Sequence, residues 1–369
     1  MRELKQSTYT NNEAGNSRMF WNKITLIQFV LSVSIVLRHA NPGNSWGIQG
    51  GVLVFTQIIT DITHFAVPAF FIISGFLFYR NISPYLTMAQ FRPIYFDKVK
   101  RRIASLVVPY LFWNFAAWLF YTVCTHLTII SSRMNMDPTA LSVAGILKAI
   151  LLSEYTPLWF VGNLIIYSAF ASLIFAFLKN KHIGTAIIIS LTIAVFAFEI
   201  SPSLIQWFPI YLFGCFLGLH YDESVICCLS GSNAFKKRKY AELTVALVLF
   251  ISAFVIFCFT KSFRSLFIFR IISCVAVIVI INIFLGHCRI IEQHELPGYA
   301  KTSFFIYCVH YVQLVCFDKI ALIFFGNGTV SYIVTYFGGW IIITVLCIAE
   351  AYTLKKLTPR FYRVVCGGR

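Results

Sequence analysis

One histidine lies far inside an apolar segment, where an ionisable side chain is costly unless it faces a partner or a cavity. His39 is about 15 residues into the segment 24–40, which as a helix puts it about 22 Å from the start of that segment. An imidazole titrates near neutral pH, so it can take a proton from a hydroxyl group. Gln28 stands eleven residues earlier, about 20° away around a helix. The pattern predicts a polar stripe that leads to a general base at His39.

Basic residues precede the apolar segment 103–124. They are Arg92, Lys98, Lys100, Arg101 and Arg102. Paired guanidinium groups bind phosphate oxygens in a bidentate way, so Arg101 and Arg102 could hold the phosphates of a cytosolic ligand. The excess of basic residues on cytosolic loops predicts the same cluster without any ligand. The sequence leaves both interpretations open.

Further ionisable residues fall toward the outer ends of predicted spans. Together with His39 they are Arg38, Asp61, His64, Glu154, Glu199, Arg270, Asp318 and Lys319. They predict a polar, partly charged cavity that opens to the outer side; the alternative is that they pair with one another or reach the lipid headgroups. We favour that alternative for Arg270 and for Asp318 with Lys319. His310, about seven residues into the segment 303–325, is predicted either to line a channel for a donor substrate or to be a hydrogen-bonded histidine of the bundle.

The elements that must position these residues are membrane-spanning helices. Of the 369 residues, 59% are hydrophobic and only 12% are charged, which is too little charge for the surface of a water-soluble domain of this length. In lipid, an apolar segment must pair its backbone groups internally, so each one is predicted to be a helix. The sequence therefore predicts an all-α, polytopic transmembrane helix bundle. Its ten predicted spans are 24–40, 62–79, 103–124, 157–178, 183–200, 203–220, 241–260, 265–286, 303–325 and 331–354.

The basic residues indicate how the chain is oriented. With the N-terminus in the cytosol, the cytosolic segments hold 23 of the 30 Lys and Arg residues and the outer loops hold only four. We therefore predict that both termini are cytosolic. Residues 1–23 are predicted to be a cytosolic tail without a cleaved signal, 24–354 the transmembrane domain, and 355–369 a basic cytosolic tail. In the long outer loop 125–156, the segment Leu141–Leu152 is predicted to be an amphipathic helix at the membrane interface.

Charge and cysteine content argue against two further classes of site. The net charge of +16 does not predict a nucleic-acid partner, because the basic residues lie mostly between apolar segments. The eleven cysteines include no CxxC pair and fall mostly in apolar segments, so neither a disulfide framework nor a metal site is predicted.

Six short segments, taken in order along the chain, resemble the motifs of the membrane-bound acyltransferase family 3. They are Ser34–His39 (SIVLRH), Pro68–Leu77 (PAFFIISGFL), Arg101–Tyr110 (RRIASLVVPY), Leu158–Tyr167 (LWFVGNLIIY), Phe208–Gly218 (FPIYLFGCFLG) and Ser303–His310 (SFFIYCVH). Each segment is mostly apolar, so the specificity comes from the presence of all six in the order and spacing that the family shows.

The resemblance implies an enzyme of a bacterial inner or plasma membrane. Such an enzyme moves an acyl group, usually acetyl, from cytosolic acyl-CoA to a hydroxyl of an extracytoplasmic glycan such as a surface polysaccharide. By the same resemblance, His39 would be the catalytic histidine, and Ser74 with Gly75 would be the SG pair of the second span. Arg101 and Arg102 would meet the CoA.

One residue departs from the family pattern. Family members usually have Arg or Lys eleven residues before the histidine, whereas this chain has Gln28, which cannot neutralise a phosphate or an oxyanion. Lys23 lies about 140° away from Gln28 around the helix and is no obvious substitute. Arg38 adjoins His39 and could supply the charge, but its position places it on another face of the helix.

Acyl transfer needs a base, stabilisation of the tetrahedral oxyanion and an anchor for the CoA phosphates. The predicted catalytic residues are His39 as base and Arg38 or Ser74 as oxyanion or orienting group, and the predicted donor-binding residues are Arg101, Arg102, Gln28 and His310. No cysteine has the setting of a nucleophile. Direct transfer and an acyl-enzyme relay therefore both stay open.

Two other functions fit parts of the pattern. Ten spans with buried charges also suit a transporter or flippase, although the sequence shows no internal repeat and no paired broken helices in corresponding halves. Gln28 leaves open a catalytically impaired family member that serves a glycan-assembly complex. A homodimer is likewise open.

Overall fold

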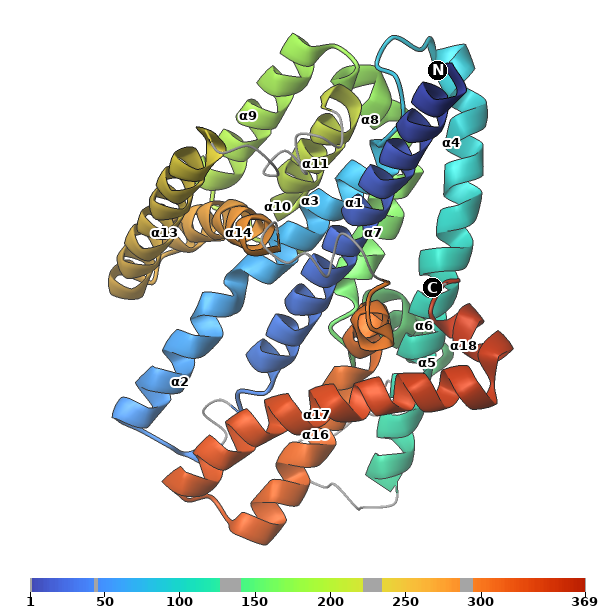
Figure 1. Ribbon diagram of the computed structural model, residues 1–369. Coiled ribbons are helices and arrows are strands. Elements are labelled where there is room, and N and C mark those ends of the chain that lie inside the picture. Colours follow the sequence, from blue (N-terminus) through green and yellow to red (C-terminus); the bar gives the residue numbers. More distant parts are fainter. Residues whose placement is uncertain (1, 43–45, 127–140, 222–233, 286–294, 369) are drawn as a thin grey trace. The chain divides into compact units, whose positions relative to one another are not determined.

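The computed structural model describes residues 2–42, 46–126, 141–221, 234–285 and 295–368, and within these ranges it contains helices and no β-strand (Figure 1). The chain divides into two compact units. Unit 1 contains Met1–Leu31, His64–Tyr85 and Leu178–Ser303, and unit 2 contains Ser32–Thr63, Leu86–Phe177 and Phe304–Arg369. The predicted all-α class is confirmed for the described ranges.

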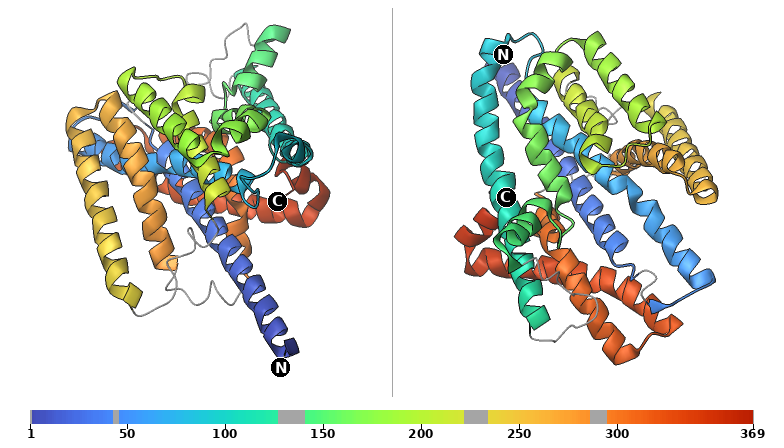
Figure 2. Two further views of the ribbon diagram at one scale, coloured as in Figure 1. Left: turned by 90° about the horizontal axis from the view of Figure 1, so that it is seen from above. Right: turned by 180° about the vertical axis from the view of Figure 1, so that it is seen from behind.

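Unit 1 holds most of helix α1 (Arg2–His39), whose last turns belong to unit 2. Its other elements are α3 (Ala66–Tyr79), α9 (Lys181–Ala197), α10 (Ser203–Gln206), α11 (Phe208–His220), α13 (Ala234–Thr260), α14 (Phe263–Leu285) and the 3-10 turn η5 (Gly298–Thr302). Helix α3 packs along α11, and α13 packs along α14 (Figures 1 and 2).

Unit 2 contains the helices that carry most of the candidate site. They are α2 (Gly51–Ile62), α4 (Met88–Arg102), the π-helical turn η3 (Ile103–Val107), α5 (Val108–His126), α6 (Val143–Leu152), α7 (Trp159–Ala169), α8 (Ala171–Leu178), α16 (Ser303–Phe325), α17 (Thr329–Leu357) and α18 (Pro359–Val365). The short 3-10 turn η2 (Thr63–Phe65) follows α2 at the boundary of the two units.

Each of the ten predicted spans falls on helix. Within the described ranges, eight helices are long and apolar enough to cross a membrane. Helices α7 and α8 form a ninth segment, bent by 65° at Phe170, and α9 is an apolar helix of 17 residues. The chain is therefore a multi-pass membrane protein. The count of ten, the cytosolic termini and the division into tails and a transmembrane domain stay predictions.

Two of the helices that carry predicted spans begin well before those spans. The helix that carries 62–79 begins at Gly51, because the apolar segment Gly51–Ile62 continues it. The helix that carries 103–124 begins at Met88, because Thr87 and Gln90 form a capping box that begins α4. The basic cluster before residue 103 therefore lies on a helix and not on a loop.

Three glycines allow the close crossing of α3 and α11 in unit 1. A Cβ at Gly214 would lie 2.2 Å from the backbone oxygen of Ile72, and one at Gly218 would lie 2.5 Å from that of Phe76. Gly75 approaches α11 equally closely from the other side. Small residues that let backbones approach are typical of helix pairs in membranes. Two of the six motifs thus meet in one helix–helix contact.

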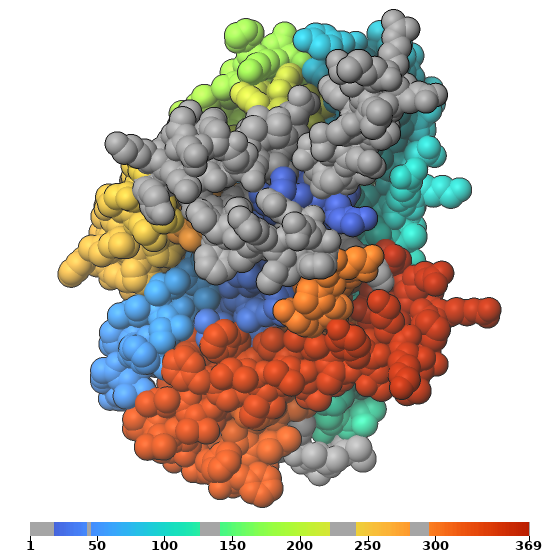
Figure 3. Space-filling model, in the orientation of Figure 1, coloured from blue at the N-terminus to red at the C-terminus, as the bar shows by residue number. Residues whose placement is uncertain are grey.

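Lipid-facing surface is evident on α17. Its exposed side chains are apolar over most of its length, as at Val330, Val334, Ile341 and Val345. The atoms of this segment are the orange-red ones on the face shown in the space-filling view of Figure 3. Such a surface is stable in lipid and unstable in water.

The predicted interfacial segment Leu141–Leu152 contains α6, which packs on α5. Ser142 caps α6 by accepting a hydrogen bond from the Gly145 N–H at 3.0 Å. Tyr110 of α5 donates from its hydroxyl to the backbone oxygen of Leu151 at 2.6 Å. These bonds fix the connection between α5 and α7.

Candidate functional site

His39 is the last residue of α1, and its ring lies against two consecutive residues of α16 in unit 2. The ring centroids of His39 and His310 are 5.4 Å apart, and the ring of Tyr311 stands edge-on at 5.4 Å from that of His39. His39 is partly exposed, whereas His310 is completely buried. The structure therefore pairs His310 with the predicted base.

Helix α16 holds His310 in one tautomer. Its Nδ1 lies 2.9 Å from the backbone oxygens of both Ile306 and Tyr307. Carbonyl oxygens only accept hydrogen bonds, so Nδ1 carries the proton and Nε2 keeps a lone pair. That Nε2 is buried and has no hydrogen-bond partner in the described part of the chain. A buried, unsatisfied acceptor costs about 1–3 kcal/mol, so its presence in an apolar bundle requires an explanation.

A cation and an anion lie close to this histidine pair. Arg38 is within electrostatic reach of both His39 and Asp61. Asp61 is a buried residue of α2, and it accepts a hydrogen bond from Gln57 Nε2 at 3.0 Å. A charge pair of opposite sign is the arrangement in which buried ionised groups are stable.

Five side chains form a hydroxyl cluster that ties the segment after His39 to α2 and α17. They are Asn41, Thr56, Thr60, Tyr332 and Tyr336. Asn41 donates to Thr60 Oγ1 at 2.9 Å and accepts from the Tyr332 hydroxyl at 2.9 Å. Thr56 lies 3.2 Å from the Tyr332 hydroxyl, and Thr60 lies 3.1 Å from that of Tyr336. The cluster fixes the backbone directly after His39 against α2 and α17.

Sequence reasoning missed this cluster, although a signal was present. Thr56 with Thr60 and Tyr332 with Tyr336 are spaced four residues apart, so each pair lies on one face of its helix. Two hydroxyl pairs at the same spacing on apolar helices can hydrogen-bond across a helix contact. Hydroxyl groups carry no charge, so these residues do not stand out among the ionisable residues of apolar segments.

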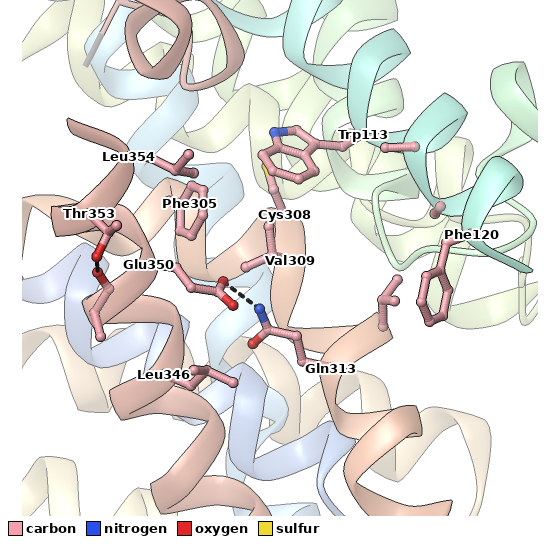
Figure 4. Close-up of a pocket in the computed structure, with 14 residues that line it drawn as sticks. Trp113, Phe120, Phe305, Cys308, Val309, Gln313, Leu346, Glu350, Thr353 and Leu354 are labelled. Atoms are coloured by element: carbon pink, nitrogen blue, oxygen red, sulfur yellow. Dashed lines mark hydrogen bonds between the residues drawn. The ribbon is translucent and has the colours of Figure 1, made fainter. Parts of the chain in front are cut away.

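A pocket of about 610 Å³ lies between α5, α16 and α17 in unit 2 (Figure 4). Its walls are mainly apolar and include Trp113, Phe305 and Val309, the last of which directly precedes His310. One polar pair enters it, since Gln313 donates to Glu350 Oε2 at 2.5 Å. None of the residues predicted for the polar outer cavity lines this pocket, so that cavity stays a prediction.

Arg101 and Arg102 end α4, and the π-helical turn η3 begins directly after them. Arg101 is exposed and Arg102 is half-buried. Single π turns inside α-helices are rare and frequent at functional sites, because the widened turn redirects backbone groups. Both interpretations of the basic cluster, phosphate binding and the cytosolic bias of basic residues, therefore stay open. The structure shows in addition that an irregular turn follows the cluster directly.

A family model for an acyltransferase domain matches residues 21–352. The chain belongs to acyltransferase family 3. Searches of curated proteins and of solved structures found no match to it. The family match includes all seven predicted site residues and ends before α18.

Two of the residues that this family resemblance singled out lie in unit 1. Ser74 is on α3 beside Gly75, within the close crossing of α3 and α11. Gln28 is a half-buried residue of α1, eleven positions before His39 on the same continuous helix. The glycine of the SG pair therefore has a packing role, and the catalytic role predicted for Ser74 stays a prediction.

Lys23 is the unexpected cation of α1 in this acyltransferase. Its side chain is 97% buried in unit 1, and its Nζ has no hydrogen-bond partner within the described residues. An ammonium group without a partner is costly in an apolar bundle. Sequence reasoning set Lys23 aside on its helical angle alone, and burial could not be deduced from the angle.

Several other ionisable residues turn out to be paired. Glu154 forms an ion pair with Lys148 at 2.6 Å, and Glu199 forms one with Arg264 at 3.1 Å. Arg270 lies over the ring of Trp207 at 5.0 Å, which agrees with the structural interpretation favoured for it. These residues need no catalytic explanation.

Proposed function

We propose that this family 3 acyltransferase is an O-acyltransferase of the cell membrane that moves an acetyl group from cytosolic acetyl-CoA to a hydroxyl of an extracytoplasmic glycan. The observation that carries the proposal is the contact between the partly exposed ring of His39 and the ring of His310, whose buried Nε2 has no hydrogen-bond partner among the described residues. A base next to an acceptor of fixed tautomer is the arrangement that deprotonation of an alcohol needs.

His39 removes the proton from the acceptor hydroxyl as its oxygen attacks the thioester carbonyl. The new C–O bond forms a tetrahedral oxyanion, and its collapse breaks the C–S bond and releases CoA, whose sulfur takes the proton from His39. His310 Nε2 has no hydrogen-bond partner among the described residues, so it is free to accept one from the other ring nitrogen of His39 once the acceptor substrate is bound. That bond fixes the tautomer of His39 and orients its free lone pair toward the hydroxyl.

The cationic groups stabilise negative charge at both ends of the donor. Arg38, which is within electrostatic reach of both Asp61 and His39, suits the oxyanion, with Ser74 as the second candidate. Arg101 and Arg102 suit the phosphates of CoA. The apolar pocket that reaches Val309 suits the uncharged pantetheine arm, and Gln313 with Glu350 can bond its amide groups.

Two measurements test this function. Mass spectrometry of surface glycans from strains with and without the gene should show acetyl esters only where the gene is present. Charge reversal of Arg101 and Arg102 to Glu should raise the Michaelis constant for acetyl-CoA at unchanged protein level. Glycans that do not differ between the strains would favour the transporter or a non-catalytic partner of a glycan-assembly complex.

A further inference from the structure

Helix α18 folds back onto the first turns of α5 in unit 2. Trp113 Nε1 donates a hydrogen bond to the backbone oxygen of Val365 at 2.9 Å, and the ring of Phe361 stands edge-on to Phe112 at 5.5 Å. Both Figure 1 and Figure 2 show the C-terminal end beside the helix that α4 and α5 form. The tail predicted as a basic cytosolic extension is therefore a docked element.

Two glycines end α18 and allow it to approach η3. The N–H of Gly368 donates to the backbone oxygen of Arg363 at 2.7 Å, and the N–H of Gly367 donates to that of Val364 at 3.2 Å. These are the two bonds of a Schellman helix end, which needs a left-handed residue where Gly367 has φ +66°. A Cβ on Gly367 would also lie 2.3 Å from the backbone oxygen of Ser105. Glycine is required here both by its backbone angle and by the contact with η3.

Basic residues from two distant parts of the sequence flank the contact between α18 and the start of α5. Arg101 precedes Ser105 by four residues, and Arg363 precedes Gly367 by four, so each lies about one helical turn from the contact. Arg360 is three residues before Arg363 and shares its side of α18. All three arginines are exposed, whereas the opposite side of α18 is buried against its neighbours.

We propose that Arg360 and Arg363 of α18 join Arg101 and Arg102 in one polyanion-binding surface whose ligand is the nucleotide part of acyl-CoA. This inference rests on the proposed function. CoA carries a pyrophosphate and a separate ribose phosphate, and arginines on two helices match such separated charges. The family match ends at residue 352, so α18 lies outside the matched residues. It supplies cations to a chain that has Gln28 where the family has a basic residue.

The same contact lies beside the apolar pocket. Trp113 and Phe305 both line the pocket, and both hold α18, the latter through Tyr362 at a ring distance of 5.9 Å. A nucleotide bound on the arginines would therefore have its pantetheine arm next to the pocket that Val309 lines.

The test measures binding of three ligands to the purified full-length protein in nanodiscs of phosphatidylcholine, without any acceptor. CoA carries all the phosphates, 3′-dephospho-CoA lacks the ribose phosphate, and pantetheine has none. The double variant Arg360→Gln with Arg363→Gln should weaken CoA binding about tenfold, since two partly solvated charge-assisted contacts are lost. Its pantetheine binding should equal that of the unchanged protein, which a general folding defect would not allow.

Matched variants separate docking from charge. Gly367→Ala should also weaken CoA binding, because α18 cannot keep its contact with Ser105, whereas a Cβ on Gly368 meets nothing within 4 Å. Gly368→Ala shares the strain of a positive φ (+82°) but adds no clash, so it should weaken CoA binding less than Gly367→Ala does. The distant pair Lys179→Gln with Lys181→Gln should leave CoA binding within about twofold, as expected for exposed sites.

Each remaining outcome overturns a specific statement. No CoA binding by the unchanged protein would overturn the proposed function itself. If the unchanged protein binds CoA and the arginine double variant binds it equally well, only the α18 site is overturned. A loss that occurs in nanodiscs containing phosphatidylglycerol and not in phosphatidylcholine would assign these arginines to lipid headgroups instead of CoA.

Discussion

At the scale of single residues, the chemistry depends on two histidines from opposite ends of the sequence. An imidazole at the end of α1 gains nothing from lipid that an apolar side chain would lack. His310 Nε2 can accept a hydrogen bond only when a donor comes close to it, and it has none among the described residues. The His39 ring lies beside it, with the ring centroids 5.4 Å apart. The pair is costly at rest and useful in proton transfer.

His39→Ala is expected to abolish transfer without unfolding the protein. Losing a general base typically costs on the order of a hundredfold to ten-thousandfold in rate. The measurement is acetyl transfer to glycan by the purified, monodisperse variant, with thermal stability recorded alongside. More than about a third of normal activity would be too much for a missing base and would make His39 a structural residue.

His310→Phe is expected to lower kcat about tenfold or more, because the His39 tautomer is no longer held by an acceptor. His310→Gln keeps an acceptor atom and should recover part of the loss. The pH profile of kcat distinguishes this from a packing role, since loss of a hydrogen bond to the base moves the profile and a cavity does not. Equal kcat and an unmoved profile in both variants would contradict the assignment.

Lys23→Met is expected to raise thermal stability. Replacing a buried charge by an apolar side chain of similar length commonly stabilises a protein by about 1–4 kcal/mol. If Lys23 is kept as a cation for the donor, in compensation for Gln28, the stabilised variant should also bind CoA more weakly. A variant that is no more stable than the parent would show that the ammonium group is satisfied in the bilayer.

Residue types alone made His39, Arg38 and Asp61 candidates, because ionisable groups in apolar segments are conspicuous. They did not pair His39 with His310, since that contact joins positions 271 apart and depends on how α1 crosses α16. The burial of Lys23 could not be predicted either, because a helical angle gives the direction of a side chain and not the residues that surround it.

At the scale of elements, apolar segments predicted nearly all helices, and local chemistry decided their ends. The capping box at Thr87 was readable as Thr-x-x-Gln but lay in a polar segment that seemed to be a loop. The π turn after Arg102 has no comparable sequence signal. The Schellman end at Gly367 could have been read from the Gly-Gly pair, but its contact with η3 could not.

Gly214→Ala is expected to destabilise unit 1 by about 1–3 kcal/mol, because the added methyl group would meet backbone rather than a movable side chain. Gly338→Ala in α17 is the matched control. The nearest atoms to a Cβ there are 3.8 Å away, so this change should be neutral or slightly stabilising. Thermal unfolding in one detergent compares the two, and equal midpoints would contradict the close crossing of α3 and α11.

At the scale of the whole molecule, function depends on which ends of the helices face the cytosol. The proposed donor site needs Arg101, Arg102 and α18 on the cytosolic side, and acetylation of a surface glycan needs an acceptor to reach His39 from the other side. The bias of basic residues supports this orientation. The count of ten depends on two elements: the bent pair α7 and α8, and α9, whose 17 residues rise only about 25 Å against a hydrocarbon core of about 30 Å.

Reporter fusions after Gly43, Lys261 and Gly328 are expected to report the outer side. Residue 43 follows the first span, so a cytosolic signal there would reverse the whole topology. The other two positions lie after α13 and α16, and their side depends on whether α9 crosses the membrane. If α9 lay along the interface instead, every later loop would change sides: the fusions at 261 and 328 would become cytosolic while that at 43 stayed outside. The basic residues of α18 would then face outward, away from any CoA, so this single pattern of signals would contradict both the ten spans and the site assigned to α18.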